Sequence, residues 1–419
     1  MSENGKSTDG TGERRAGEQA VSRAVSWDAF FSTYLPALVL ALGTGIALPA
    51  IPSLAKSFNV EFALASGVVT SFLIGNLFGT LPGGWLIDRF GRRPVLIAGP
   101  LLTAVAALLV FFAESFSQLL VLRFINGIAA QLWLMARLAA ISQGAAPKER
   151  GRQVSWMFGM DSAGKLAGPV IGGVIAATLG PRATFLAYAL LALLAVIPVA
   201  YYARRIPKRD PEESKRARAP LSPAVLRALI VPRLPYFGVA LFAGLTRGPV
   251  YADLLHLYAA FAYNLGPQAI GWLATGASAI SLPIGFAAGW AMDRFGRKHT
   301  MVPGFSGAAL AMLALALSAF LQLSLGWYIA LFFFAIFTQS LTGGSIQTVG
   351  ADVAPPEARG TFLGLWRFTG QGGATISPII FALLAQHVNY GTAFLFVAGS
   401  AFVVAWLLIR HVAETRTSE

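Results

Sequence analysis

Cysteine is absent from the 419 residues, and charged residues are scarce. Without a thiol, the chain has no disulfide framework, thiolate metal site or cysteine nucleophile. Asp, Glu, Lys and Arg make up 12% of the chain, where a soluble domain has about a quarter. The four histidines are too scattered to bind a metal: His256, His299, His387 and His411. These shortages exclude an ordinary soluble enzyme, and neither a metal nor another cofactor is expected.

Apolar residues dominate instead, at 56% of the chain. A helix that crosses a membrane needs about 20 apolar residues. Runs of that length predict twelve transmembrane helices, at 29–51, 63–87, 94–113, 118–142, 153–179, 182–202, 236–262, 268–292, 300–321, 325–349, 361–385 and 390–411. The predicted fold class is therefore an all-α membrane protein.

The basic residues gather on one side of this topology. If both termini lie on the same side, most of the 32 Lys and Arg residues fall in the tails and loops of that side, and the opposite loops hold only Lys56 and Arg182. Cytoplasmic loops are rich in Lys and Arg, so both termini are predicted to be cytoplasmic. The net charge of +13 then reflects topology and attraction to membrane lipid, with no nucleic acid as a partner.

The chain contains an internal repeat. Residues 84–93, Gly-Trp-Leu-Ile-Asp-Arg-Phe-Gly-Arg-Arg, recur at 289–298 as Gly-Trp-Ala-Met-Asp-Arg-Phe-Gly-Arg-Lys. Such a repeat predicts two similar halves, here two six-helix bundles. The predicted parts are a disordered tail at 1–28, a first bundle at 29–202, a basic cytoplasmic linker at 203–235, a second bundle at 236–411 and a tail at 412–419.

The repeated loop resembles the signature of the major facilitator superfamily, and the resemblance extends from the first predicted helix to the twelfth. It implies that Asp88, Arg89 and Arg92 form a cytoplasmic latch that holds an outward-open state, with Arg367 as a partner for this loop. Alternatively, the loop only fixes topology through its charge. The predicted latch residues are Gly84, Asp88, Arg89, Gly91, Arg92, Asp293, Arg294, Arg297 and Arg367.

Two further helices carry patterns of the same family. Arg123 lies in a stretch of the fourth helix that resembles a second family motif. Gly164, Gly168 and Gly172, with Pro169, are similar to the antiporter motif of drug:proton exporters, which implies export. Glycines at this spacing also allow two helices to pack closely, so a role in packing alone is the alternative.

Ionisable residues within the predicted spans are candidates for function, because each is costly in a membrane. Lys165 and Arg247 lie near the midpoints of their helices in opposite halves, and transporters of this kind bind substrate between their halves. We therefore expect these two cations to hold one anionic group. Alternatively, Lys165 pairs with Asp161 one turn earlier, for which Arg137 competes. The predicted substrate-binding residues are Lys165, Arg247, Arg137, Gln339 and Gln347.

Proton coupling is assigned to Asp161, Asp253 and His256. Gly248 and Pro249 should interrupt the seventh helix just before Asp253. Asp253 and His256 are three residues apart, so they share a helix face and can exchange a proton with the outside. A hydrogen-bonded pair with a purely structural role is the alternative.

These features predict a monomeric secondary transporter of the cell membrane that works by alternating access. The expected activity is proton-coupled export of an amphipathic, anionic organic molecule. A proton-coupled symporter that imports an organic anion is one alternative. A non-transporting membrane receptor or a lipid scramblase is another.

Overall fold

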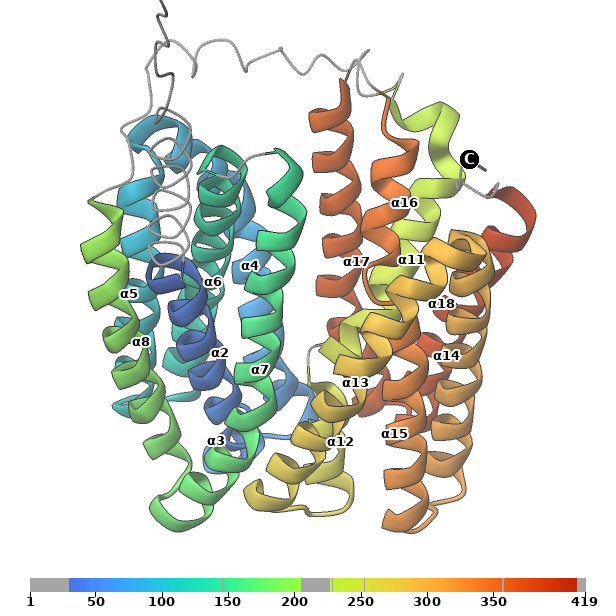
Figure 1. Cartoon of the computed structure of the whole chain (residues 1–419). Helices are drawn as coiled ribbons and strands as arrows, with labels where there is room; N and C mark the ends of the chain where they lie inside the picture. The colour runs from blue at the N-terminus through green and yellow to red at the C-terminus, as the bar shows by residue number, and fades with distance from the viewer. Residues whose placement is uncertain are drawn as a thin grey trace, which may run out of the picture.

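The protein is described by a computed structural model that covers residues 30–144, 147–204, 227, 229–251, 253–355 and 358–412. The predicted tails and most of the predicted linker lie outside these residues, and so does the side chain of Asp88. Every element within the described residues is a helix (Figure 1).

The chain before the linker forms a first group of helices. A π-helix, Phe30–Tyr34, leads into α2 (Leu35–Ala47) and α3 (Ala50–Lys56), which are separated at Leu48 and Pro49. The longer helices of the first group are α4 (Phe62–Phe90), α5 (Arg92–Phe111), α6 (Phe116–Gly144), α7 (Pro147–Leu179) and α8 (Pro181–Ala203).

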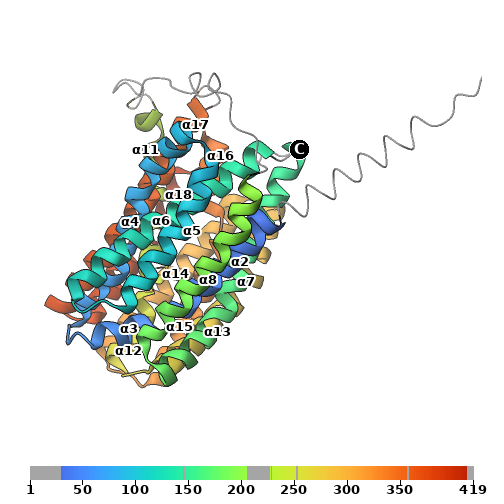
Figure 2. The same ribbon diagram turned by 90° about the vertical axis from the view of Figure 1, so that its left-hand side faces the viewer.

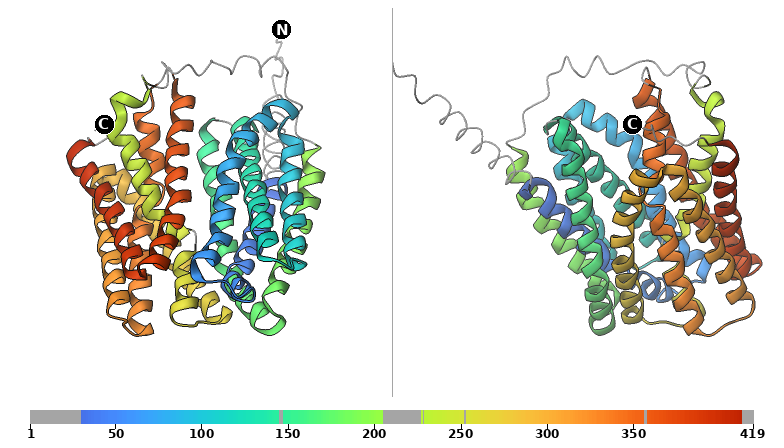
Figure 3. Two further views of the ribbon diagram at one scale, coloured as in Figure 1. Left: turned by 180° about the vertical axis from the view of Figure 1, so that it is seen from behind. Right: turned by 45° about the vertical axis from the view of Figure 1, so that its right-hand side comes forward.

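The chain after the linker forms a second group of helices. A 3-10 turn, Val231–Arg233, precedes it. Its helices are α11 (Leu234–Tyr251), α12 (Leu254–Ala262), α13 (Pro267–Phe295), α14 (Arg297–Phe320), α15 (Leu325–Leu341), α16 (Ser345–Val353), α17 (Arg359–His387) and α18 (Tyr390–His411). Figures 2 and 3 show the two groups standing side by side.

Eleven segments of the described residues are long and apolar enough to cross a membrane, and each overlaps a predicted run. Two of these segments continue across a break, from α2 to α3 and from α15 to α16. The exception among the predicted runs is 236–262, which is divided into α11 and α12. Pro249 lacks an amide hydrogen, and Asp253 adopts a left-handed backbone conformation with φ 53°, which a continuous α-helix does not allow. The break between α15 and α16 lies at Gly344, where φ is 71°.

Packing within the two groups follows the internal repeat. In the first group α2 packs on α7 and α5 on α8, and in the second α11 packs on α17 and α14 on α18. The groups meet most extensively where α4 packs on α17 and α7 on α13, and α12 also contacts α3 and α4. Large apolar side chains such as Phe78, Ile197 and Phe286 are exposed, as expected where helices face lipid.

The two ends of the molecule are called the linker side and the far side. The linker side is where α8 ends at Ala203 and α11 begins at Leu234, and the far side carries Ser57, Asn264 and His387. In Figure 1 the linker side is at the top and the far side at the bottom, where α3 and α12 lie close together.

Candidate functional site

Arg137 of α6 and Asp161 of α7 form an ion pair inside the first group. Arg137 Nη1 donates to Asp161 Oδ1 at 3.0 Å, and Nη2 donates to Oδ2 at 3.1 Å. The arginine and aspartate side chains are only 5% and 19% exposed. In the structure, Asp161 therefore pairs with Arg137, and not with Lys165 one turn later.

Lys165 is exposed and lies on the inner side of α7. At 3.6 residues per turn, lipid-facing Val174 is half a turn round the helix from Lys165. Gly164 and Gly168, on the neighbouring face, pack against α2. The Lys165 carbonyl accepts a hydrogen bond from Ser278 Oγ of α13 at 3.3 Å. The backbone of α7 at Lys165 therefore lies against α13 of the second group, on the face of α7 opposite Val174.

Arg247 is buried inside the second group. Its Nη2 donates to the carbonyl oxygen and, at 2.6 Å, to Oγ1 of Thr342, and its guanidinium lies over the ring of Phe305 at 5.6 Å. These contacts tie α11 to the break between α15 and α16. Only 7% of Arg247 is exposed, and within the described residues no contact joins it to Lys165.

The two predicted glutamines lie apart. Gln339 is buried and its Nε2 donates to the Thr246 carbonyl at 3.4 Å, whereas Gln347 is exposed on α16. Gln339 Oε1 has no hydrogen-bond partner among the described residues. Gln339 therefore belongs to the buried surroundings of Arg247.

Asp253 and His256 lie together at the start of α12. Asp253 Oδ1 is 3.5 Å from His256 Nδ1, and the aspartate side chain is 32% exposed while the histidine is 7% exposed. Neither ring nitrogen of His256 has a hydrogen-bond partner among the described residues. The exposed carboxylate, rather than the buried imidazole, has access to water.

The two copies of the repeated loop have the same geometry. Gly91 and Gly296 end their helices with φ 81° and 103°, which side chains disfavour. Arg89 lies over Trp85 at 5.2 Å, and Arg294 lies over Trp290 at 5.4 Å.

The two copies differ in what surrounds them. Arg297 Nη1 donates to Asp293 at 3.3 Å, and its Nε lies 3.4 Å from Asp352. In both copies the first glycine is open: a Cβ added to Gly84 or to Gly289 would meet no atom within 4 Å. Arg92 begins α5.

The motif residues of the fourth and fifth helices pack within the first group. Arg123 is buried, donates to the Val68 carbonyl at 3.4 Å and lies over Phe72, which ties α6 to α4. A Cβ on Gly164 would approach the Leu38 carbonyl oxygen to 2.6 Å, and one on Gly172 would come still closer to the Ile46 carbonyl oxygen. These contacts support the packing explanation of the glycines.

A contact that the sequence interpretation missed joins the groups at the far side. Lys56 Nζ donates to the Ala260 carbonyl at 2.6 Å and to Asn264 Oδ1 at 3.0 Å. Beside it, Gln386 donates to Glu61 at 3.0 Å. Lys56 is a cation at the C-terminal end of α12, which favours positive charge. Lys and Arg are rare in the loops of that side, so the sequence alone could have marked Lys56 as a candidate for a specific contact.

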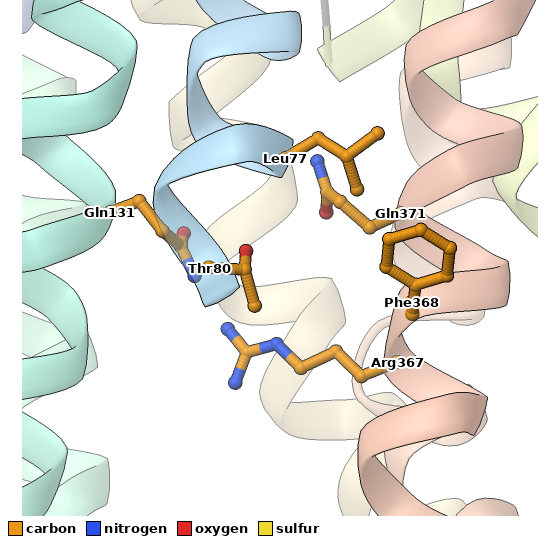
Figure 4. A pocket seen from close by; sticks show the side chains of 6 residues that line it. All are labelled: Leu77, Thr80, Gln131, Arg367, Phe368 and Gln371. Carbon is orange, nitrogen blue, oxygen red and sulfur yellow. The ribbon is translucent and has the colours of Figure 1, made fainter. Parts of the chain in front are cut away.

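A small pocket lies between the groups on the linker half of the molecule (Figure 4). Its walls come from α4 and α6 on one side and from α17 on the other. It is lined by Leu77, Thr80, Gln131, Arg367, Phe368 and Gln371. Arg367, predicted as a partner of the latch loop, thus lines a pocket between the groups.

The sequence matches the family described as Major Facilitator Superfamily over residues 34–262 and 237–419. The chain is 24% identical over 382 residues to "Tetracycline resistance protein, class B" of Escherichia coli, covering 89% of this chain and 92% of that protein. It is 23% identical over 381 residues to "Multidrug resistance protein 2" of Bacillus subtilis (strain 168), covering 87% and 92%.

Solved structures show the same fold. The xylose transporter XylE from E. coli, in its inward open conformation, superposes with a TM-score of 0.72 at 18% identity, over 93% of this chain and 97% of that chain. A POT family transporter in complex with 5-aminolevulinic acid gives 0.75 at 12% identity, over 92% and 95%. The predicted resemblance is confirmed: the chain belongs to the major facilitator superfamily, as a multi-pass membrane transporter and not an enzyme.

Proposed function

We propose that the protein exports an amphipathic, anionic small molecule from the cytoplasm in exchange for protons. Two relatives that match most of the chain bear names of resistance to tetracycline and to several drugs, which supports export. The glycine pattern of α7 is similar to that of proton-coupled exporters, although it also serves packing.

Charge inside the membrane carries the proposal for an anionic substrate. Asp161 is occupied by two hydrogen bonds from Arg137, so the nearby Lys165 keeps an uncompensated positive charge. Its side chain is exposed, so it is available to pair with an incoming anion. An anionic group of the substrate supplies the compensating charge when it enters the space that Lys165 faces. Arg247, already bonded to Thr342, has a structural role in this proposal.

Proton coupling rests on Asp253, with His256 beside it. The carboxylate is partly exposed and lies at the break between α11 and α12, where backbone groups are free of regular helical bonding. A proton taken up here from outside the cell changes the charge of the break. In this proposal Asp161 has a structural role in its ion pair with Arg137 and does not take part in proton transfer.

The topology follows from the charge distribution. The linker side is cytoplasmic, α11 and α12 together form a twelfth crossing, and the chain works as a monomer of two six-helix bundles, 29–202 and 236–411. We assign this conformation as the inward-facing one, because the far side carries contacts between the groups.

Transport in vesicles tests the proposal. Purified protein is reconstituted, a pH gradient is imposed, and uptake is followed for tetracycline, an amphipathic sulfonate dye and an amphipathic quaternary ammonium dye. Exchange moves substrate and proton in opposite directions, so vesicles acidic inside should accumulate substrate, whichever way the protein is inserted. Accumulation only with acid outside would indicate symport. Equilibration without accumulation would indicate a protein that does not couple to protons.

A further inference from the structure

The pocket in Figure 4 is lined by Arg367, whose side chain is exposed. Arg367 lies eight residues into α17, roughly 12 Å from its start. Its side chain extends from α17 towards Thr80 and Gln131 of the first group. The other three arginines inside the spans are occupied: Arg123 by Val68, Arg137 by Asp161 and Arg247 by Thr342. Arg367 has no hydrogen-bond or ion-pair partner among the described residues.

The rest of the lining suits an acidic group with an apolar body. None of the six lining residues is acidic, so nothing in the pocket neutralises the guanidinium. Gln131, which is 8% exposed, offers an amide donor on the Thr80 side of the pocket, and Gln371 offers a second beside Leu77. Guanidinium and amide donors together match the two oxygens of a carboxylate or the three of a sulfonate. Leu77 and Phe368 supply the apolar wall.

We propose that this pocket binds the acidic group, a carboxylate or sulfonate, of the compound that the protein transports. The proposal rests on the proposed export and moves the second anion ligand from Arg247 to Arg367. It keeps the principle that the two halves each supply a cation, Lys165 from α7 and Arg367 from α17.

The position of the pocket ties binding to the transport cycle. Thr80 and Gln131 belong to the first group and Arg367 and Gln371 to the second, so the site is complete only when α4 and α17 stand as they do here. A ligand with different affinities for two states shifts their populations. An anion in this pocket therefore favours the conformation described here.

The test compares binding of an amphipathic sulfonate dye and an amphipathic quaternary ammonium dye by titration of the purified full chain. Arg367→Gln should weaken sulfonate binding by about tenfold or more, the loss expected for hydrogen bonds to a charged group. Binding of the ammonium dye should not weaken. Arg367→Lys should restore part of the sulfonate affinity, since the charge is kept without the planar fork. Arg182→Gln, which removes a cation at the far side, is the matched control and should change neither affinity.

Two results would overturn the proposal. One is unchanged sulfonate affinity in Arg367→Gln. The other is an equal loss for both dyes in a variant whose melting temperature matches the unmodified protein, which would mark a structural role. Transport by the unmodified protein in vesicles distinguishes failure of the pocket proposal from failure of the export proposal. If the unmodified protein accumulates substrate under a pH gradient but Arg367→Gln leaves the sulfonate affinity unchanged, only the pocket proposal is rejected. If sulfonate binding depends on Arg367 but no proton-driven accumulation occurs, only the export proposal is rejected.

Discussion

Arg137 and Asp161 meet through two parallel hydrogen bonds, which tie α6 to α7 inside the first group. Arg137 and Lys165 were both candidates to pair with the Asp161 carboxylate, and the structure shows that Arg137 does so. Because the arginine has the carboxylate, Lys165 is left with its charge on the inner face of α7. The assignment of Lys165 to substrate therefore depends on this buried pair.

Removing the carboxylate of this pair should destabilise the protein. Asp161→Asn leaves the Arg137 charge buried and unpaired, which costs about 3–5 kcal/mol in comparable pairs. The double variant Arg137→Leu, Asp161→Leu should lose much less, because no unpaired charge remains. Thermal unfolding of the purified variants measures both. Equal losses for the single and double variants would show that the charge of Arg137 is compensated elsewhere.

The far-side contact of Lys56 should hold the described conformation. Lys56→Gln weakens the bonds to Ala260 and Asn264, so the far side should open more often. Spin labels on Ser57→Cys and His387→Cys report the separation of the groups there, and the chain has no other cysteine. We expect a larger population of long distances in Lys56→Gln. The Arg182→Gln control removes the other predicted far-side cation, which bonds within its own group; a similar shift there would reject the specific role of Lys56.

Asp253→Asn should separate exchange from proton-driven transport. The amide cannot release a proton, so accumulation under a pH gradient should be lost, while exchange of labelled for unlabelled substrate needs no net proton movement and should persist. Glu114→Gln, at an exposed far-side acid, is the control. Accumulation that survives Asp253→Asn would make the Asp253–His256 pair structural.

The two copies of the latch loop should respond unequally. Asp88→Asn should slow transport several-fold without loss of folded protein. Asp293→Asn should be milder, because Arg297 retains Asp352 when Asp293 is removed. Initial transport rates, corrected for the amount of folded protein, give the ranking. A larger defect in Asp293→Asn would reverse the assignment of the main latch to the first copy.

Sequence patterns predicted the helices well because hydrophobic length decides them directly. The breaks within helices were harder to predict. Those at Leu48–Pro49 and Gly344 were missed, and in the seventh helix Gly248 and Pro249 were recognised but the left-handed Asp253 was not. The sites were also harder to predict. Sequence position gives the depth of Arg247 and Arg367 in the membrane, but not the direction of either side chain. That direction depends on how each helix is rotated against its neighbours, and the partners of Arg247 and Lys56 include backbone carbonyls, which no sequence pattern marks.

The central claim, that substrate leaves in exchange for protons, is tested most directly by the pH inside vesicles. Reconstituted vesicles are made acidic inside and loaded with a trapped pH-sensitive dye, and a transported compound is added outside. The account predicts that the interior becomes more alkaline on addition, because each molecule that enters drives protons out, and that Asp253→Asn abolishes this change. Further acidification on addition, or no change while the compound is taken up, would contradict it.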